Sequence, residues 1–445
     1  MSLHRNFIAL AILCSAFLDA PLRAQWWDIP SVLANTLSER SVGKLQIKLD
    51  VRGRYETKRG INFGKDPDID TALIRTRLGM TYLPVSWLKV AGTLQDSRSP
   101  FYGDNTSSTV RDPLDLYESY VELFPDKPAG FGMSVGRRAA SYGEGRLIGT
   151  PQWGNCSRGL DQASVYYRWP GMRLEALVVS PVKIRMGDFN APVLGDRIWG
   201  TYDVFPSLYH KSSLDFYVLH RDQNRPGGFN SGVQALGTDR LTHNTYGFRV
   251  YGPLLAGTVY SLEAAIQRGK VGPAELHADA LFAGLTRGFH IGSKTFSASG
   301  EYKFASGTAN PRDPLRSGTF DQLYAANHDR FGHQDLFSWR NLHNMRSLET
   351  LGLTKALALN FQYSSFWLAN IHDALYNSSG KALAQSMSGA AGRHVGEETD
   401  LFATYRRGHW LFGAGYGYLF KGEFVRNTTP GANTNYAYLF HTYSF

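Results

Sequence analysis

The chain has 445 residues and a formal net charge of +9, with 33 Arg against 14 Lys. Aromatic residues make up 13% of the chain and Gly occurs 46 times, although the mean hydropathy is negative. No apolar run is long enough for a transmembrane helix, and no linker or shift in composition marks a boundary between soluble domains. The composition therefore excludes a helical membrane protein and disfavours a string of separate soluble domains.

The first predicted element is a secretory signal peptide over residues 1–24. Arg5 precedes an apolar run from Phe7 to Leu18, and Ala24 offers a small residue at the cleavage point. Cleavage there removes Cys14 and leaves Cys156 as the only thiol, so we expect no intramolecular disulfide and no Cys-based metal site. Export through the inner membrane also separates this basic chain from nucleic acid.

Alternating polar and apolar residues predict β-strands along the whole mature chain. In residues 74–82, Arg75 and Arg77 share one face, and Ile74, Leu78 and Met80 share the other. The predicted strands cover residues 45–56, 74–82, 87–96, 115–123, 131–138, 161–169, 172–179, 197–204, 214–220, 245–251, 258–267, 277–287, 296–304, 347–354, 357–368, 399–406, 411–420 and 436–445.

Lipid outside and water inside a closed sheet explain this alternation. Residues 25–445 are therefore expected to form one all-β domain, a transmembrane antiparallel β-barrel of about 18 strands (roughly 16 to 20), with long extracellular loops and short periplasmic turns. The last predicted strand ends on the aromatic Phe445, which suits a closing strand with its ring in the interfacial girdle. Together with the signal peptide, this ending indicates the bacterial outer membrane, where we expect a monomer surrounded by lipid.

Two long, turn-rich connections, residues 97–113 and 305–335, are candidates for segments that fold into the barrel. A barrel this wide cannot fill its lumen with strand side chains alone, so either loop could form a constriction or a plug. The second loop holds His328 and His333, which with Asp321 or Asp335 could bind a metal. Polar histidines of a plug are the favoured interpretation, and we expect no metal and no cofactor.

Strand phase places many basic side chains on the inner face of the barrel. Rings of Arg and Lys select anions, because the low-dielectric wall concentrates their field on the path. A smaller number of inward carboxylates is expected to hold individual arginines in fixed rotamers. The inward set comprises Arg52, Arg54, Arg75, Arg77, Arg249, Glu118, Glu301 and Lys303.

The block 136–161 carries the most specific motif in the chain. It reads Gly136-Arg137-Arg138-Ala139-Ala140-Ser141-Tyr142-Gly143-Glu144-Gly145-Arg146-Leu147-Ile148-Gly149, then Trp153-Gly154-Asn155, then Arg158-Gly159-Leu160-Asp161. This block resembles the alginate export family of outer-membrane porins, whose pattern has a Gly-Arg pair, a Tyr-Gly-acid-Gly-Arg-Leu run, a Trp-x-Asn step and an Arg followed shortly by Asp. Weaker matches lie at 320–335, 364–380 and 397–400. The chain departs from the family at Leu160, where Phe is frequent, and Arg138 adds a second basic residue.

The resemblance implies a barrel of about 18 strands with an arginine-lined, electropositive conduit for a polyuronate. Carried onto this chain, the conduit residues are Arg52, Arg54, Arg75, Arg77, Arg137, Arg146, Arg158 and Arg340, with Glu118 and Asp161 as orienting carboxylates. A periplasmic scaffold of a secretion system is a partner that such a conduit would use.

Three functions follow from these expectations. The first is a conduit for an anionic, alginate-like polysaccharide or its fragments. The second is a specific porin for the uptake of small organic anions, and the third is a plugged barrel with a structural or enzymatic role. No Gly-x-Ser-x-Gly elbow occurs, and the Gly-rich run 143–149 lacks the Lys-Ser/Thr of a phosphate loop, so the sequence does not predict an enzyme.

Overall fold

The structure of the protein, a computed structural model, describes residue 38 and residues 44–100, 110–125, 127–224 and 240–445. The predicted signal peptide lies outside these residues, as does the middle of the predicted loop 97–113. Within the part of the chain that is described, no helix combines the length and the apolarity needed to cross a bilayer.

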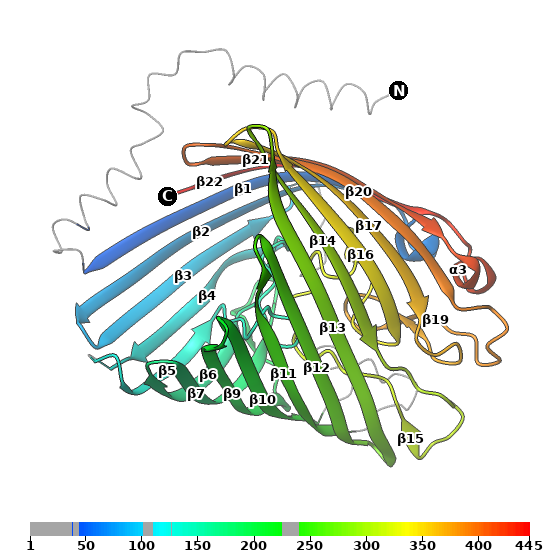
Figure 1. The fold of residues 1–445 in the computed structure, drawn as a ribbon, viewed down its shortest axis with the longest axis horizontal. Helices are drawn as coiled ribbons and strands as arrows, with labels where there is room; N and C mark the ends of the chain where they lie inside the picture. Colours follow the sequence, from blue (N-terminus) through cyan, green and yellow to red (C-terminus); the bar gives the residue numbers. More distant parts are fainter. Residues whose placement is uncertain (1–37, 39–43, 101–109, 126, 225–239) are drawn as a thin grey trace.

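Eighteen antiparallel strands form one closed barrel (Figure 1). They are β1 (Leu45–Arg59), β2 (Ile69–Val85), β3 (Leu88–Arg98), β4 (Asp112–Leu123), β5 (Gly130–Arg138), β6 (Leu160–Trp169), β7 (Met172–Lys183), β9 (Asp196–Tyr209), β10 (Ser212–Gln223), β11 (Leu241–Leu255), β12 (Thr258–Val271), β13 (Ala274–Ile291), β14 (Lys294–Ala305), β16 (Leu342–Gly352), β17 (Leu357–Leu368), β20 (His394–Arg407), β21 (Trp410–Lys421) and β22 (Thr434–Ser444). Each predicted strand overlaps one of these, which confirms the predicted fold.

The loops contain several short elements of secondary structure. The two-residue strand β8 (Ala191–Pro192) pairs with the end of β7, and β15 (Arg316–Ser317) pairs with the start of β13. Separately, β18 (Leu375–Tyr376) pairs with β19 (Ala382–Ala384). A 3-10 turn, η1 (Ile61–Phe63), follows β1, and a short helix, α3 (Glu423–Thr428), precedes β22.

The first and last strands close the barrel. β1 and β22 pair antiparallel from Asp50 opposite Ser444 to Arg59 opposite Asn435. Phe445 extends this seam, since its amide donates to the Leu49 carbonyl at 3.1 Å and its carbonyl oxygen accepts from the Leu49 amide at 3.2 Å. An open edge in hydrocarbon would leave backbone groups without partners, so the terminal residue contributes to closure through its backbone as well as its ring.

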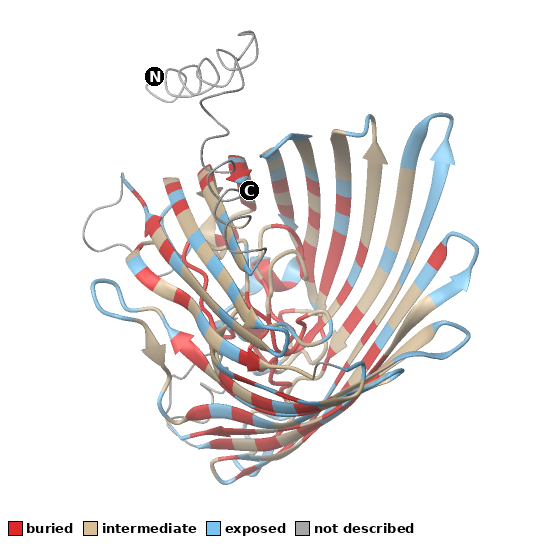
Figure 2. Ribbon diagram, turned by 90° about the vertical axis from the view of Figure 1, so that its left-hand side faces the viewer, coloured by how far each residue is buried: buried red, intermediate tan, exposed pale blue. Residues whose placement is uncertain are grey.

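Burial alternates along the strands as the sequence pattern predicts (Figure 2). On β2, the outward side chains Ile74, Leu78 and Met80 are 44%, 43% and 50% exposed, whereas the inward Arg75 is 5% exposed. Large apolar side chains exposed in this regular way form the lipid-facing surface of a barrel.

The two ends of the barrel differ in their connections. At the end where β1 starts and β22 finishes, the turns 86–87, 170–171 and 256–257 are short. At the other end, most connections are long, including 139–159, 306–341 and 369–393, although 272–273 joins β12 to β13 directly. Short turns are periplasmic and long loops extracellular in such barrels, so the long-loop end faces the outside.

Part of the wall projects beyond the lipid on the long-loop side. β13 has 18 residues, whereas a tilted strand crosses the hydrocarbon with roughly 9–11. Its first half presents Glu275, His277 and Asp279 outward, all exposed, while Leu276 and Ala278 are buried on the inner face. Polar residues on the outer face and apolar ones inside indicate a wall bathed by water rather than by acyl chains.

Arginine substitutions at two outward-facing positions test whether the first half of β13 lies outside the hydrocarbon layer. We expect Leu78→Arg to lower the free energy of unfolding in lipid by about 2–4 kcal/mol, and His277→Arg to lower it by about 0–1 kcal/mol. Guanidinium-induced unfolding in phospholipid vesicles measures both. Equal costs for the two variants would place the upper half of β13 inside the hydrocarbon layer.

Candidate functional site

Two extracellular loops fold into the lumen and join there. The first inner loop (residues 139–159) connects β5 to β6, and the second inner loop (residues 306–341) connects β14 to β16. They run side by side at Ile148 and Tyr324, where the Tyr324 amide donates to the Leu147 carbonyl at 2.8 Å and the Gly149 amide donates to the Tyr324 carbonyl at 3.0 Å. Of the two loops that the sequence offered as candidates, 305–335 enters the lumen, whereas the middle of 97–113 lies outside the described residues. The motif block 136–161 supplies the partner of 305–335.

The joined loops have an apolar core of their own against the barrel wall. Ile148, Phe320 and Tyr324 are almost fully buried, together with inward wall residues such as Leu219 and Leu276. The long-loop half of the lumen is therefore dry on this side, and the expected aqueous, polar inner face does not extend over it. Apolar inward positions follow from the need to pack the loops.

Arginines of β1 and β2 hold the first inner loop by its backbone. Arg52 donates to the Gly154 carbonyl at 2.9 Å, Arg54 to the Trp153 carbonyl at 2.7 Å, and Arg75 to the Gln152 carbonyl at 2.8 Å. Guanidinium has five donors in a fixed fork, so it can satisfy several carbonyls of a loop that has no strand partner.

The Trp153 side chain completes this anchor with aromatic contacts. The Arg54 guanidinium lies over its ring at 4.4 Å, and His328 of the second inner loop stacks on it with ring centroids 4.6 Å apart. Its indole N–H donates to the Tyr436 hydroxyl at 3.2 Å. One tryptophan thus links the wall and both inner loops.

Asp321 anchors the second inner loop through buried ion pairs. Its carboxylate accepts from Arg221 of β10 and from Arg340 at 2.5 Å each, and lies 3.1 Å from His243 of β11. Arg221 also pairs with Asp196 at 2.9 Å. Burial alone raises the pKa of Asp321, but the two guanidiniums outweigh it and hold the pKa far below its ordinary value.

A third anchor ties residues 328–335 to strands β20 and β22. The Gln334 amide donates to Glu398 at 2.9 Å, and the His333 imidazole lies 2.8 Å from the Tyr438 hydroxyl and 3.5 Å from Asp329. Burial lowers the pKa of His333, but the attraction of Asp329 outweighs it, so the pKa lies above its ordinary value.

Cations that remain partly exposed form a second population on the lumen wall. Lys89 of β3 and Arg138 of β5 both face Glu122 of β4, at 2.8 and 3.8 Å, and both lie over the Tyr120 ring. Arg138 is 29% exposed at its side chain, unlike Arg54 at 3%. These groups are available to a solute as well as to their partners.

The same band continues around the wall to the first inner loop. Arg173 of β7 lies over the Tyr166 ring at 3.7 Å and pairs with Glu175 at 2.9 Å, and its side chain is 35% exposed. Glu175 accepts from the Tyr142 hydroxyl at 3.2 Å. We call this sequence of cations and tyrosines on the lumen wall the basic track; it comprises Lys89, Tyr120, Arg138, Tyr166, Arg173 and Tyr142.

The basic track leads to a cluster around Glu144 of the first inner loop. Glu144 faces Arg146 at 2.7 Å, Arg249 of β11 at 3.1 Å and Arg330 of the second inner loop at 3.6 Å. Burial raises the pKa of Glu144, but the three guanidiniums outweigh it and hold the pKa below its ordinary value.

Most of the predicted lumen residues lie inside the barrel, in several groups. Arg77 donates to the Gln152 side chain at 2.7 Å, and Arg158 donates to the Tyr324 carbonyl at 3.3 Å. Glu118 accepts from the Ala139 amide at 2.9 Å, and Glu301 pairs with Lys303 and Arg346. The arginines do not converge on one constriction, because most of them bind the backbone or the carboxylates of the inner loops and hold those loops in place.

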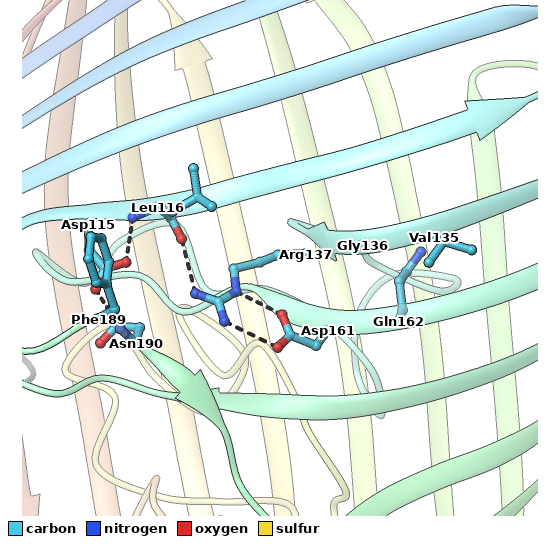
Figure 3. Close-up of a pocket in the computed structure, with 9 residues that line it drawn as sticks. All are labelled: Asp115, Leu116, Val135, Gly136, Arg137, Asp161, Gln162, Phe189 and Asn190. Atoms are coloured by element: carbon cyan, nitrogen blue, oxygen red, sulfur yellow. Dashed lines mark hydrogen bonds and ion pairs between the residues drawn. The ribbon is translucent and has the colours of Figure 1, made fainter.

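Arg137 and Asp161 are wrong as lumen residues, since they lie on the outer face. They are paired in register and share their face with the lipid-exposed Val135 and Val165. The ion pair is bidentate, at 2.7 and 3.1 Å, and Arg137 also donates to the Leu116 carbonyl (Figure 3). It borders an outer cavity of about 530 Å³ that Phe189 and Asn190 also line. Neighbouring residues of a strand point to opposite faces, so Arg137 points outward and Arg138 inward. The motif alone does not distinguish these two faces.

Several residues of the site were missed by the sequence reasoning. The track residues Lys89, Arg138 and Arg173 lie on predicted strands. The anchors Asp196, Arg221 and His243 lie one or two residues beyond the predicted strands 197–204, 214–220 and 245–251, although the observed strands β9, β10 and β11 include them. Extending the strand-phase argument to every basic residue would have placed Arg138 and Arg173 inward. The partners of Asp321 and Glu144 depend on the path of the loops, which alternation does not describe.

Comparison with known proteins agrees with this architecture. The sequence pattern of the family described as alginate export matches residues 43–439. Among solved structures, the outer membrane protein OpdK of Pseudomonas aeruginosa is similar with a TM-score of 0.60 at 9% identity, over 90% of this chain and 98% of that one. OccD3 (OpdP) of the same organism has a TM-score of 0.60 at 13% identity, over 90% and 91%. No curated protein matches the chain. At such identities the solved structures show the fold alone.

Removal of the shared carboxylate tests the buried anchor. Asp321→Asn leaves Arg221, Arg340 and His243 without their common anion, and breaking a buried ion pair costs roughly 3–5 kcal/mol. We expect the second inner loop to become accessible to trypsin in the assembled barrel. Asp313→Asn, on the same loop but in an exposed pair with Arg316, is the control. Equal resistance of both variants would contradict the anchoring role.

The raised pKa of His333 gives a pH dependence with a defined sign. Its charge stabilises the folded loop fully below the ordinary pKa of 6.5, and this stabilisation is lost as the pH rises through the higher folded value. We expect the free energy of unfolding of the wild type to fall over that rise, and His333→Gln to remove this component. His277→Gln, on the outer face, should retain it. Denaturant unfolding between pH 6 and about pH 9 measures it.

Proposed function

Because the chain belongs to the alginate export family, whose members are outer-membrane porins, we propose that it is a passive conduit for an anionic polysaccharide, an alginate-like polyuronate, or its fragments. The barrel and the family support a transport channel rather than an enzyme. The proposal assigns a path and a class of solute, and no direction of transport.

The single observation that carries the proposal is the basic track. Its cations are a quarter to a third exposed at the side chain, from 24% for Lys89 to 35% for Arg173. Each lies beside a carboxylate, so it offers part of its charge and keeps a fixed position. A uronate polymer has one carboxylate per sugar, which such cations can bind in turn.

The Tyr120 ring of the basic track suits a carbohydrate as well as an anion. It is partly exposed and lies between Lys89 and Arg138, whereas Tyr166 is buried under Arg173 and supports that guanidinium. An aromatic face offers apolar contact to the C–H groups of a sugar ring, and the neighbouring cation offers a charge-assisted hydrogen bond to its carboxylate. Conduction requires contacts strong enough to admit the solute and weak enough to release it, which partly exposed, already paired cations satisfy.

Small organic anions are the second candidate solute. OpdK, which has the same fold, has been solved with vanillate, a small carboxylate, at 10% identity to this chain. The two inner loops occupy much of one side of the lumen here, which favours small solutes over thick ones. The same basic track would serve both classes.

Recording in planar bilayers tests the proposal. A salt gradient gives the ratio of anion to cation permeability, and polygalacturonate and D-glucuronate are then added as blockers. Anion selectivity with block by the polymer supports the polysaccharide conduit, and block by the monomer alone supports the small-anion porin. A cation-selective channel that neither uronate affects would overturn both.

Charge removal on the track tests its part in conduction. At about 10 Å in water one charge contributes roughly 0.4 kcal/mol, or about a factor of two. We therefore expect Arg138→Gln and Arg173→Gln each to lower the anion conductance about twofold, and the double variant about fourfold. Arg316→Gln, at a side chain 86% exposed on the outer part of the second inner loop, should leave it unchanged. Unchanged conductance in the double variant would remove the basic track from the path.

A further inference from the structure

Glu144 occupies a cradle of guanidiniums that projects into the lumen. Its Oε1 accepts from Arg249 at 3.1 Å and from Ser261 at 3.3 Å, and its Oε2 accepts from Arg146 at 2.7 Å and lies 3.6 Å from Arg330. A carboxylate held from several sides in this way has the surroundings of a bound ligand rather than of a simple surface pair.

The backbone presents Glu144 at the tip of a tight turn. Gly143 and Gly145 on either side have φ angles of +58° and +71°, which other L-residues rarely adopt, and the Gly145 amide donates to the Tyr142 carbonyl at 3.0 Å. The side chain is 36% exposed, in contrast to Glu263 at 6% and Asp215 at 2%. Glu144 is therefore the carboxylate of the cluster that water and solutes reach.

The charges of the cluster balance only while Glu144 is in place. Three guanidiniums face three carboxylates: Arg146, Arg249 and Arg330 against Glu144, Glu263 and Asp215. If Glu144 turns away, Arg146 retains Glu263 at 3.0 Å and Arg249 retains Asp215 at 2.7 Å. Arg330 then keeps its hydrogen bond to the Glu144 backbone carbonyl but pairs with no other carboxylate among the described residues. The three guanidiniums therefore exceed their carboxylate partners by one charge, which one further carboxylate can balance.

We propose that this cradle is a carboxylate-binding site of the conduit, that Glu144 occupies it as an internal stand-in, and that a uronate carboxylate of the solute replaces Glu144 on Arg249 and Arg330 during passage. This inference rests on the proposed function and adds a specific subsite to it. The exchange is one carboxylate for another, so the guanidiniums are never left unpaired in the lumen.

An internal stand-in would explain how a strongly cationic site avoids trapping its solute. A site that is free for only a fraction of the time binds with an apparent affinity reduced by that fraction. The solute is then released when Glu144 returns, and the affinity remains in the range that conduction requires. The Tyr142 backbone at the base of the turn connects this subsite to the basic track.

Equilibrium binding of D-glucuronate to the full barrel in detergent tests the inference, with single-channel block as a second readout. If Glu144 holds the cradle nine-tenths of the time, Glu144→Gln should raise the affinity about tenfold. Glu275→Gln makes the same chemical change on the outer face of β13, 69% exposed, and should leave the affinity unchanged. Adding Arg330→Gln to Glu144→Gln should abolish the gain.

The outcomes separate the inference from the proposed function. An anion-selective wild type with an unchanged or lower affinity for glucuronate in Glu144→Gln overturns the inference and leaves the conduit standing. A cation-selective wild type overturns the conduit itself. Heat-dependent migration in gels verifies that each barrel has assembled. Glu144→Asp, which retracts the carboxylate by one methylene, replaces the Gln variant if that one does not assemble, with a rise in affinity expected and its absence counting against the inference.

Discussion

The width of the barrel is the constraint on which the rest of the structure depends. Eighteen strands enclose a lumen that wall side chains cannot fill, so it holds water, segments between strands, or both, and here two long loops enter it. A loop inside a barrel brings backbone carbonyls and amides that no strand pairs with, and each one needs a partner. The inward arginines of β1 and β2 provide those partners for residues 152–154. The pairing of β1 with β22 and the arginine contacts to the loops thus both provide partners for backbone groups that would otherwise have none.

The arginines fall into two groups that differ in burial and in role. Those that are almost fully buried, such as Arg54 and Arg221, face loop carbonyls or carboxylates and fix where the loops lie. A buried ion pair contributes little net stability, because desolvation offsets the attraction, but it penalises any arrangement that leaves one partner alone. The partly exposed cations, such as Arg138 and Arg173, retain access to water. Rigid loops and accessible charge therefore come from one residue type in two environments.

The sequence predicted the barrel, the strands and the inward phase of most arginines. Alternate side chains of a strand face lipid and the lumen, so polar and apolar residues alternate with a period of two. From their length and turn residues the sequence offered 305–335 and 97–113 as two candidate inward loops, without deciding between them. Arg137 shows where motif reasoning fails, since one step along a strand separates an outer-face ion pair from the lumen residue Arg138. The cluster around Glu144 joins it to Arg249 and Arg330, which lie 105 and 186 positions further along the chain, and no local pattern carries that information. Apolar inward positions such as Leu276 follow from loop packing, which is equally remote from sequence periodicity.

The projecting half of β13 has a consequence for the dynamics of the barrel mouth. Its outer face stands in water, but its backbone is paired on both sides: with β12 from Val271 opposite Ala274, and with the second inner loop, where the Glu275 amide donates to the Leu315 carbonyl at 2.9 Å and the Asp279 amide to the Ser306 hydroxyl at 2.8 Å. Amide protons held in this way exchange with solvent only when the pairing opens as a unit. Hydrogen–deuterium exchange would therefore find slow amides at a wet rim, and the mouth of the barrel would behave on this side as a rigid lip, not as a set of free loops.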